Sequence, residues 1–96
     1  MAALSKDEIR QTLKKMPEWS LAGNAIHRKF ALKSFLAAIA FVNKIAEAAE
    51  QASHHPDITI NYNHVSISLS THSESGVTSK DFKLAEAIDK IYSSVS

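Results

Sequence analysis

Apolar and polar residues recur with two different periods along the chain, and the changes of period predict three helices and four strands. Ser5 and Glu8 have the spacing of a capping box and precede apolar residues at helical intervals. Pro17 ends this pattern, because proline does not continue a helix. We therefore expect a first helix at about residues 6–15.

A β-hairpin is predicted next. Trp19-Ser20-Leu21 is a short strand candidate, and Gly23-Asn24 can form its turn, since both residues tolerate positive φ. Along the second strand, successive residues point to opposite sides of the predicted sheet. One side carries Ile26, Arg28, Phe30 and Leu32, and the other carries His27, Lys29 and Ala31.

From Ser34 the period lengthens to three or four residues, which predicts an alanine-rich amphipathic helix over about 34–52. Its small side chains suit close packing on a sheet or a contact between subunits. Pro56 forces His55 out of helical geometry. We expect four aromatic side chains to lie in the core: Trp19, Phe30, Phe35 and Phe41.

A second hairpin has apolar residues at every other position. One strand contains Ile58, Ile60 and Tyr62, and the next runs from Val65 to Thr71 with serines on its opposite face. Asn63-His64 is the predicted turn between them. We expect the serine-rich face of the sheet to be polar and open.

Thr78 and Asp81 form a second capping-box pattern, and the apolar stripe of the last helix runs from Leu84 to Val95. The predicted order is therefore α-β-β-α-β-β-α. The two hairpin connections are too short for parallel crossovers. One-sided helices and a one-sided sheet bury each other, which predicts an α+β two-layer sandwich in a single domain over residues 1–96.

The composition excludes several functional classes. Eleven Lys and Arg against ten Asp and Glu give a net charge of +1. This lacks the excess of positive charge that direct nucleic-acid binding requires. With no cysteine, the chain has no disulfide framework and no Cys-based zinc site. It shows neither a signal-peptide pattern nor the apolar run of ~20 residues that a membrane span requires. We expect a cytoplasmic protein without a membrane partner.

Histidine is the residue type that points to chemistry, since this short chain contains five. His54-His55-Pro56 follows the long helix, and His72 ends the second hairpin. The start of one antiparallel strand lies beside the end of the next, so we expect these three imidazoles at one edge of the sheet. Acid–base work suits histidine's ordinary pKa of about 6.5, and a three-His metal site is the alternative. Adjacent side chains do not naturally face a common ion, which favours acid–base chemistry.

Two carboxylates accompany these histidines. Asp81, at the third position of the last helix, could accept a hydrogen bond from His72 and fix its tautomer. It could equally serve as a capping residue alone. Glu50, one turn before His54, is either a solvated helix residue or a site carboxylate.

These residues together resemble a known family. The pattern comprises Glu50-x-x-x-His54-His55-Pro56, Tyr62-Asn63, Ser70-Thr71-His72 and Gly76-Val77-Thr78-x-x-Asp81. Over nearly the whole chain it resembles the pterin-4a-carbinolamine dehydratases, also known as dimerisation cofactors of a hepatocyte homeodomain transcription factor. The resemblance implies a four-stranded antiparallel sheet with three helices on one face. It implies dehydration of 4a-hydroxytetrahydropterin to quinonoid dihydropterin in tetrahydrobiopterin recycling, with no metal and no other cofactor.

By position, the resemblance implies catalytic roles for His54, His55 and His72. It implies substrate binding by Glu50, Pro56, Thr71, Ser73, Glu74 and Asp81. It also implies a homodimer or homotetramer. Vertebrate members carry Asp where this chain has Ser53 and an aromatic residue where it has Ile58, which bears on the pocket's shape and on any transcription-factor partner. A non-enzymatic dimerisation module, acting through the helix at 34–52, is the alternative function.

Overall fold

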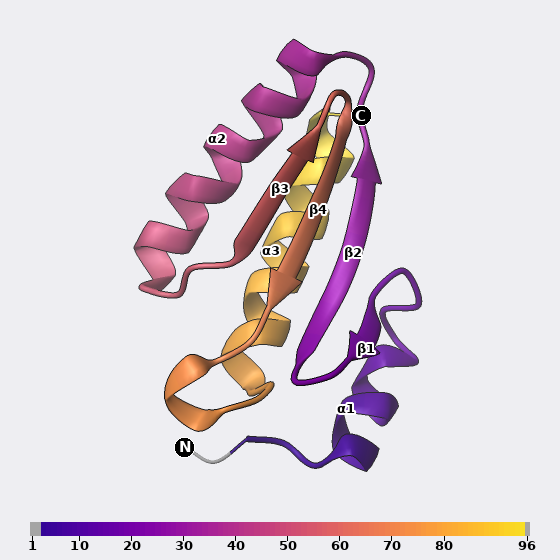
Figure 1. The fold of residues 1–96 in the computed structure, drawn as a ribbon, viewed down its shortest axis with the longest axis vertical. Helices are drawn as coiled ribbons and strands as arrows, with labels where there is room; N and C mark the ends of the chain where they lie inside the picture. The colour runs from indigo at the N-terminus through magenta and orange to yellow at the C-terminus, as the bar shows by residue number, and fades with distance from the viewer. Residues whose placement is uncertain (1–2, 96) are drawn as a thin grey trace.

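The computed structural model describes residues 3–95 and confirms the order α-β-β-α-β-β-α. Its elements are α1 (Lys6–Leu13), β1 (Ser20–Ala22), β2 (Ala25–Ala31), α2 (Phe35–Ala52), β3 (Asp57–Asn61), β4 (His64–Leu69), the short 3-10 helix η1 (His72–Glu74) and α3 (Ser79–Val95). The strands form one antiparallel sheet in the order β1-β2-β4-β3. Figure 1 shows α3 behind the sheet, α2 alongside β3 and α1 beside β1. The predicted two-layer α+β architecture is confirmed.

The core lies between the sheet and the two long helices. Alternate residues of β2 and β4 are buried there, including Ile26, Phe30, Val65, Ile67 and Leu69. The ring of Phe30 is central: its centroid lies 5.0 Å from that of Phe41 in α2 and 4.9 Å from that of Tyr92 in α3. The intervening residues of the strands face away from the helices, as the alternation predicted.

Arg28 is the charged residue on the helix-facing side of β2, where its guanidinium has partners. It pairs with Asp89 of α3 at 2.8 Å and lies 4.3 Å from the centre of the Phe30 ring. The indole Nε1 of Trp19 donates to the same carboxylate at 3.0 Å. Asp89 thus joins the N-terminal segment, β2 and α3 through charge-assisted hydrogen bonds.

Two sequence-based placements in the hydrophobic pattern are wrong. Phe35 is 47% exposed, because the buried stripe of α2 begins at Ala38 and Phe35 lies in the first turn before it. Tyr62 is 69% exposed with φ of +55°, since it is a turn residue and not part of β3.

The turn of the second hairpin is Tyr62-Asn63, one residue earlier than expected, because Asn61 pairs with His64. Asn63 is tied to the chain after β2: Leu32 N donates to Asn63 O at 2.8 Å, and Asn63 Nδ2 donates to Leu32 O at 2.9 Å. These bonds hold the turn at its observed position.

Element ends differ by a few residues from the predictions. The first helix ends at Leu13, and β4 ends at Leu69. The capping box of α1 is confirmed, with Ser5 Oγ accepting from Glu8 N at 3.1 Å. The backbone N–H of Ser5 donates to the Glu8 carboxylate and holds the pKa of that group below its ordinary value.

Within residues 3–95, no helix has the length and apolar character needed to cross a membrane.

Candidate active site

The C-terminus of α2 places the first histidine. Ser53 adopts the left-handed conformation, with φ 51° and ψ 40°. The amide of Ser53 donates to Glu50 O at 3.1 Å, and that of His54 donates to Ala49 O at 3.0 Å. This pair of bonds is a Schellman motif, which reverses the chain and satisfies two terminal carbonyls. The chain therefore turns back toward α3 at His54.

Asp81, in the first turn of α3, receives His54. His54 Nε2 lies 2.5 Å from Asp81 Oδ1, and Asp81 itself is fully buried. The other carboxylate oxygen, Oδ2, accepts from Thr71 Oγ1 and from the Thr78 amide, both at 2.9 Å. A buried carboxylate requires such partners, because its desolvation is costly.

The hydroxyls around Asp81 have defined hydrogen-bond directions. Thr71 uses its only hydroxyl proton on Asp81, so its oxygen must accept from Thr78 Oγ1, 2.8 Å away. Thr78 Oγ1 in turn accepts from the amide of Lys80 at 3.2 Å. Every donor in this network is directed toward the carboxylate. The arrangement supplies hydrogen bonds to Asp81 at the N-terminal end of α3, where the helix dipole also favours an acidic side chain.

The partner expected for Asp81 was therefore wrong: Asp81 binds His54 and not His72. The capping prediction is confirmed by the Thr78 amide bond. Because a carboxylate only accepts, His54 must donate through Nε2, which leaves Nδ1 as its second functional nitrogen. Nδ1 of His54 forms no hydrogen bond within the described residues. Every side-chain nitrogen and oxygen that is buried there does have a hydrogen-bond partner. Nδ1 is therefore not among the buried atoms and reaches the molecular surface.

His55 points to a different carboxylate. Its Nε2 lies 2.5 Å from Glu50 Oε1, and both side chains are largely exposed, at 66% and 76%. The two neighbouring histidines thus have separate acidic partners, Asp81 for His54 and Glu50 for His55. Glu50 is both a solvated residue at the end of α2 and the partner of His55. Pro56 leads into β3 and is partly buried.

His72 begins η1, together with Ser73 and Glu74. The expected strand to Thr71 is interrupted: Thr71 forms an isolated bridge with Gly76, with its amide donating to Gly76 O at 2.7 Å. The imidazole of His72 is exposed. Since Thr71 is bonded to Asp81, His72 follows directly after a residue of the same network that holds His54.

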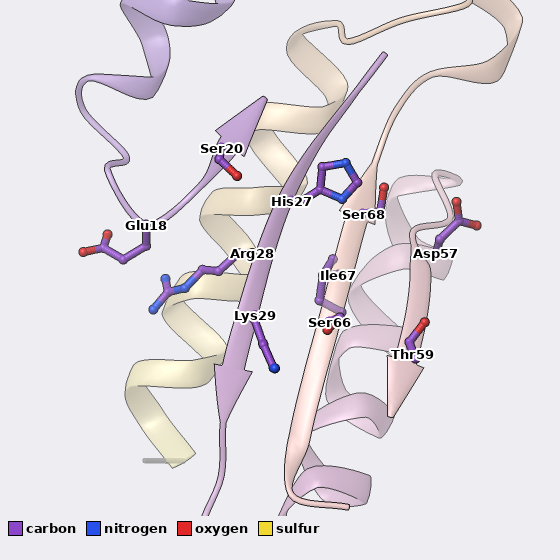
Figure 2. Close-up of a pocket in the computed structure, with 10 residues that line it drawn as sticks. All are labelled: Glu18, Ser20, His27, Arg28, Lys29, Asp57, Thr59, Ser66, Ile67 and Ser68. Carbon is purple, nitrogen blue, oxygen red and sulfur yellow. The ribbon is translucent and has the colours of Figure 1, made fainter. Parts of the chain in front are cut away.

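Two surface depressions of about 410 Å³ each are present in the described part of the chain. One lies on the open face of the sheet (Figure 2), where it is lined mainly by polar residues of all four strands, with Lys29 and His27 from β2 and Asp57 from β3. The other lies between α2 and α3 and includes His54. The second depression contains a residue of the Asp81 network, and the first contains none.

Sequence reasoning missed Thr78 as a member of this network and missed the groove between the helices. The spacing of Thr78 and Asp81 signalled only a cap. Within residues 3–95, no group of three or more His, Asp or Glu side chains is placed to hold a metal ion.

The fold and this network define a small α+β protein with a histidine held by a buried carboxylate. The family model described as pterin 4 alpha carbinolamine dehydratase matches residues 2–91. The chain therefore belongs to the pterin-4a-carbinolamine dehydratase family, which places it among the hydro-lyases.

Individual relatives agree with this assignment. A protein of Chloroflexus aggregans is 55% identical over 92 residues, covering 95% of this chain and 98% of the relative; one of a Picosynechococcus species is 50% identical, covering 92% and 96%. Both bear the name "Putative pterin-4-alpha-carbinolamine dehydratase". The crystal structure of a transcriptional coactivator/pterin dehydratase from Brucella melitensis is 36% identical with a TM-score of 0.90, covering 94% of this chain and 98% of that one.

Proposed function

We propose that this enzyme dehydrates 4a-hydroxytetrahydropterin to quinonoid dihydropterin by histidine acid–base catalysis, in tetrahydrobiopterin recycling in the cytoplasm. The observation that carries the proposal is the bond from His54 Nε2 to buried Asp81, which leaves Nδ1 at the surface. A fixed imidazole with one accessible nitrogen is suited to proton transfer near neutral pH.

The reaction needs two proton transfers. The C4a–O bond breaks as a proton is delivered to the leaving hydroxyl, which departs as water. A second proton is removed from a ring nitrogen, so the pterin loses one water molecule in total. One histidine in the imidazolium form and one neutral histidine supply both transfers, and exchange with solvent restores their starting states. No redox step or external reactant is needed.

We assign these two transfers to His54 and His72, with His55 binding and polarising the pterin. His54 lies at the groove and is positioned by Asp81, while His72 follows Thr71 of the same network. His55 is paired with exposed Glu50 and is less constrained. The remaining proposed substrate contacts are Pro56, Thr71, Ser73 and Glu74.

Alanine substitution of each histidine tests the proposal. His54→Ala and His72→Ala should lower kcat by about 10²–10⁴-fold, the usual contribution of general acid–base catalysis, while His55→Ala should act mainly on KM. His27→Ala, which removes a partly buried imidazole from the open face of the sheet, is the matched control. Near-normal dehydration by all three site variants would exclude histidine acid–base catalysis. Unchanged turnover with a chelator is expected, and loss of turnover would indicate a metal site.

Self-association is part of the proposal. Phe35 and Leu36, in the first turn of α2, are 47% and 76% exposed. Apolar side chains of this size at one helix end suit a contact with a second copy. Light scattering should give the mass of a dimer or tetramer, and Leu36→Lys should lower that mass without reducing the catalytic rate constant. An unchanged mass would show that this surface is not the contact.

A further inference from the structure

The groove between α2 and α3 has two chemically different parts. Small apolar side chains form much of its lining, from Ala48 and Ala52 of α2 and Leu84 and Ala87 of α3. His54 lies at the same groove. Its volume of about 410 Å³ is within the usual range for sites that bind small organic molecules. A flat ring system or its substituent can therefore rest on alanine walls while remaining next to the reactive imidazole.

Positive charge is confined to one side of this groove. Lys80 and Lys83 are three residues apart on α3, and apart from His54 they are the ionisable residues of the lining. Neither ammonium group forms an ion pair within the described residues. Lys80 also lies in the first turn of α3, where the helix dipole adds positive potential.

This charge pattern distinguishes the groove from the depression on the open sheet face. There, the two cations Arg28 and Lys29 are balanced by two carboxylates, Glu18 and Asp57. The groove contains lysines but no acidic lining residue, although the chain as a whole is nearly neutral at +1. Acidic residues of the two helices, such as Glu47 and Glu86, are exposed and lie outside the lining. The groove is therefore complementary to an anion.

We infer that the groove holds the 6-substituent of the pterin substrate and that Lys80 and Lys83 select a substituent carrying a carboxylate or a phosphate ester. This inference rests on the proposed function, since it concerns the same site and the same ring chemistry. It differs in the 6-substituent: an anionic group, in place of the neutral dihydroxypropyl group of biopterin, is the preferred one. His54 acts on the ring, and the lysines bind the substituent without taking part in proton transfer. They are specificity-determining residues.

Binding of stable 7,8-dihydropterins tests the inference. Three ligands share the ring and differ at position 6: a neutral dihydroxypropyl group, a carboxylate and a phosphooxymethyl group, which is a phosphate ester. Titration of the full chain should show tighter binding of both anionic ligands at about 0.05 M salt and a much smaller difference at about 0.5 M, since salt screens exposed charges. Inorganic phosphate should compete only weakly, because it lacks the ring.

The matched variants are Lys80→Gln, Lys83→Gln, their double variant and Lys90→Gln. Lys90 is an exposed lysine of α3 outside the groove. Each groove substitution should weaken anionic binding by roughly 2–5-fold, the range for exposed charge interactions, and the double variant should bind all three ligands alike. Lys90→Gln should leave both the preference and the dehydration of a neutral pterin unchanged.

The outcomes separate the two proposals. Equal binding of the three ligands by the unaltered chain, or a preference that survives in the double variant, overturns the inference while dehydratase activity can stand. Absence of both pterin binding and dehydration overturns the inference and the proposed function together. If Lys80→Glu/Lys83→Glu changes the mass in light scattering and no ligand preference exists, the groove is a contact between copies and the inference is wrong.

Discussion

Replacing Asp81 by asparagine should disable His54 without removing its side chain. Asp81 accepts three hydrogen bonds in the buried interior: one from His54 at Oδ1, and two at Oδ2 from Thr71 and the Thr78 amide. Asparagine has the same shape but only one accepting oxygen. The backbone N–H of Thr78 can only donate, so the amide oxygen must occupy the Oδ2 position.

The asparagine NH₂ group then faces His54 Nε2. That nitrogen can no longer donate and must accept, so the neutral ring places its proton on Nδ1, the atom that reaches the surface. If the ring were protonated to imidazolium, the N–H at Nε2 and the asparagine NH₂ group would be two donors facing each other. Both forms required for proton transfer through Nδ1 are thus disfavoured, and we expect kcat to fall by about 10²–10³-fold, within the range for a lost acid–base group. Loss of the charge-assisted bond should lower the free energy of unfolding by about 1.5–3 kcal/mol.

Steady-state dehydration kinetics and urea unfolding of the same preparation measure these two effects. Glu50→Gln is the matched control, because it removes a carboxylate from an exposed histidine pair and should change stability by less than about 1 kcal/mol. A folded Asp81→Asn enzyme whose kcat lies within about threefold of the unaltered value would refute the proposed role of Asp81.

Three further predictions concern local structure. Tyr62→Asn should raise the free energy of unfolding by about 0.5–1 kcal/mol in urea titrations, because asparagine tolerates the positive φ at this turn better than tyrosine does. Gly76→Ala should cost about 1 kcal/mol, since the added Cβ would lie 3.0 Å from Ala3 Cβ, and Ala3→Gly in the same chain should restore stability if this contact is the cause. The lowered pKa of Glu8 means that its capping contribution is present above the ordinary value of 4.5 and is lost as pH falls through the lowered one. The stability difference between the unaltered chain and Glu8→Gln should therefore shrink in strongly acidic buffer, and a difference independent of pH would contradict this assignment.

Local patterns predicted the fold well because each element has its own sequence signal. Ser5 with Glu8 marked the start of α1, Gly23 marked the first turn, and the alternation in β2 predicted the buried positions of Ile26 and Phe30. Tyr62 and Phe35 show the limit of this approach. Their side chains fit an apolar pattern, but hydrogen bonds of Asn63 and the position of the helix end relative to the sheet decide their exposure.

The sequence indicated which residues belong to the candidate site better than it indicated which of them form hydrogen bonds with one another. His54 and Asp81 were both expected to belong to it, but the hydrogen bond between them spans 27 positions and depends on how α2 packs beside α3. The sequence offered a bond from His72 and a plain cap as equal alternatives for Asp81, and it carried no signal for the packing that brings His54 to this carboxylate. The left-handed residue at Ser53 was equally hidden, since serine carries no signal for that conformation.

The bond from His54 to Asp81 joins two rigid bodies, since one residue follows α2 and the other belongs to α3. A hydrogen bond fails with a separation change of well under about 1 Å, so the spacing of the helices limits how far the proposed catalytic geometry can vary. Ala49 and Ala85 are buried small residues of these helices. A larger side chain at either position would overpack the core that these helices share. Selection for catalysis is therefore expected to act on these two alanines, although neither carries a group that could react.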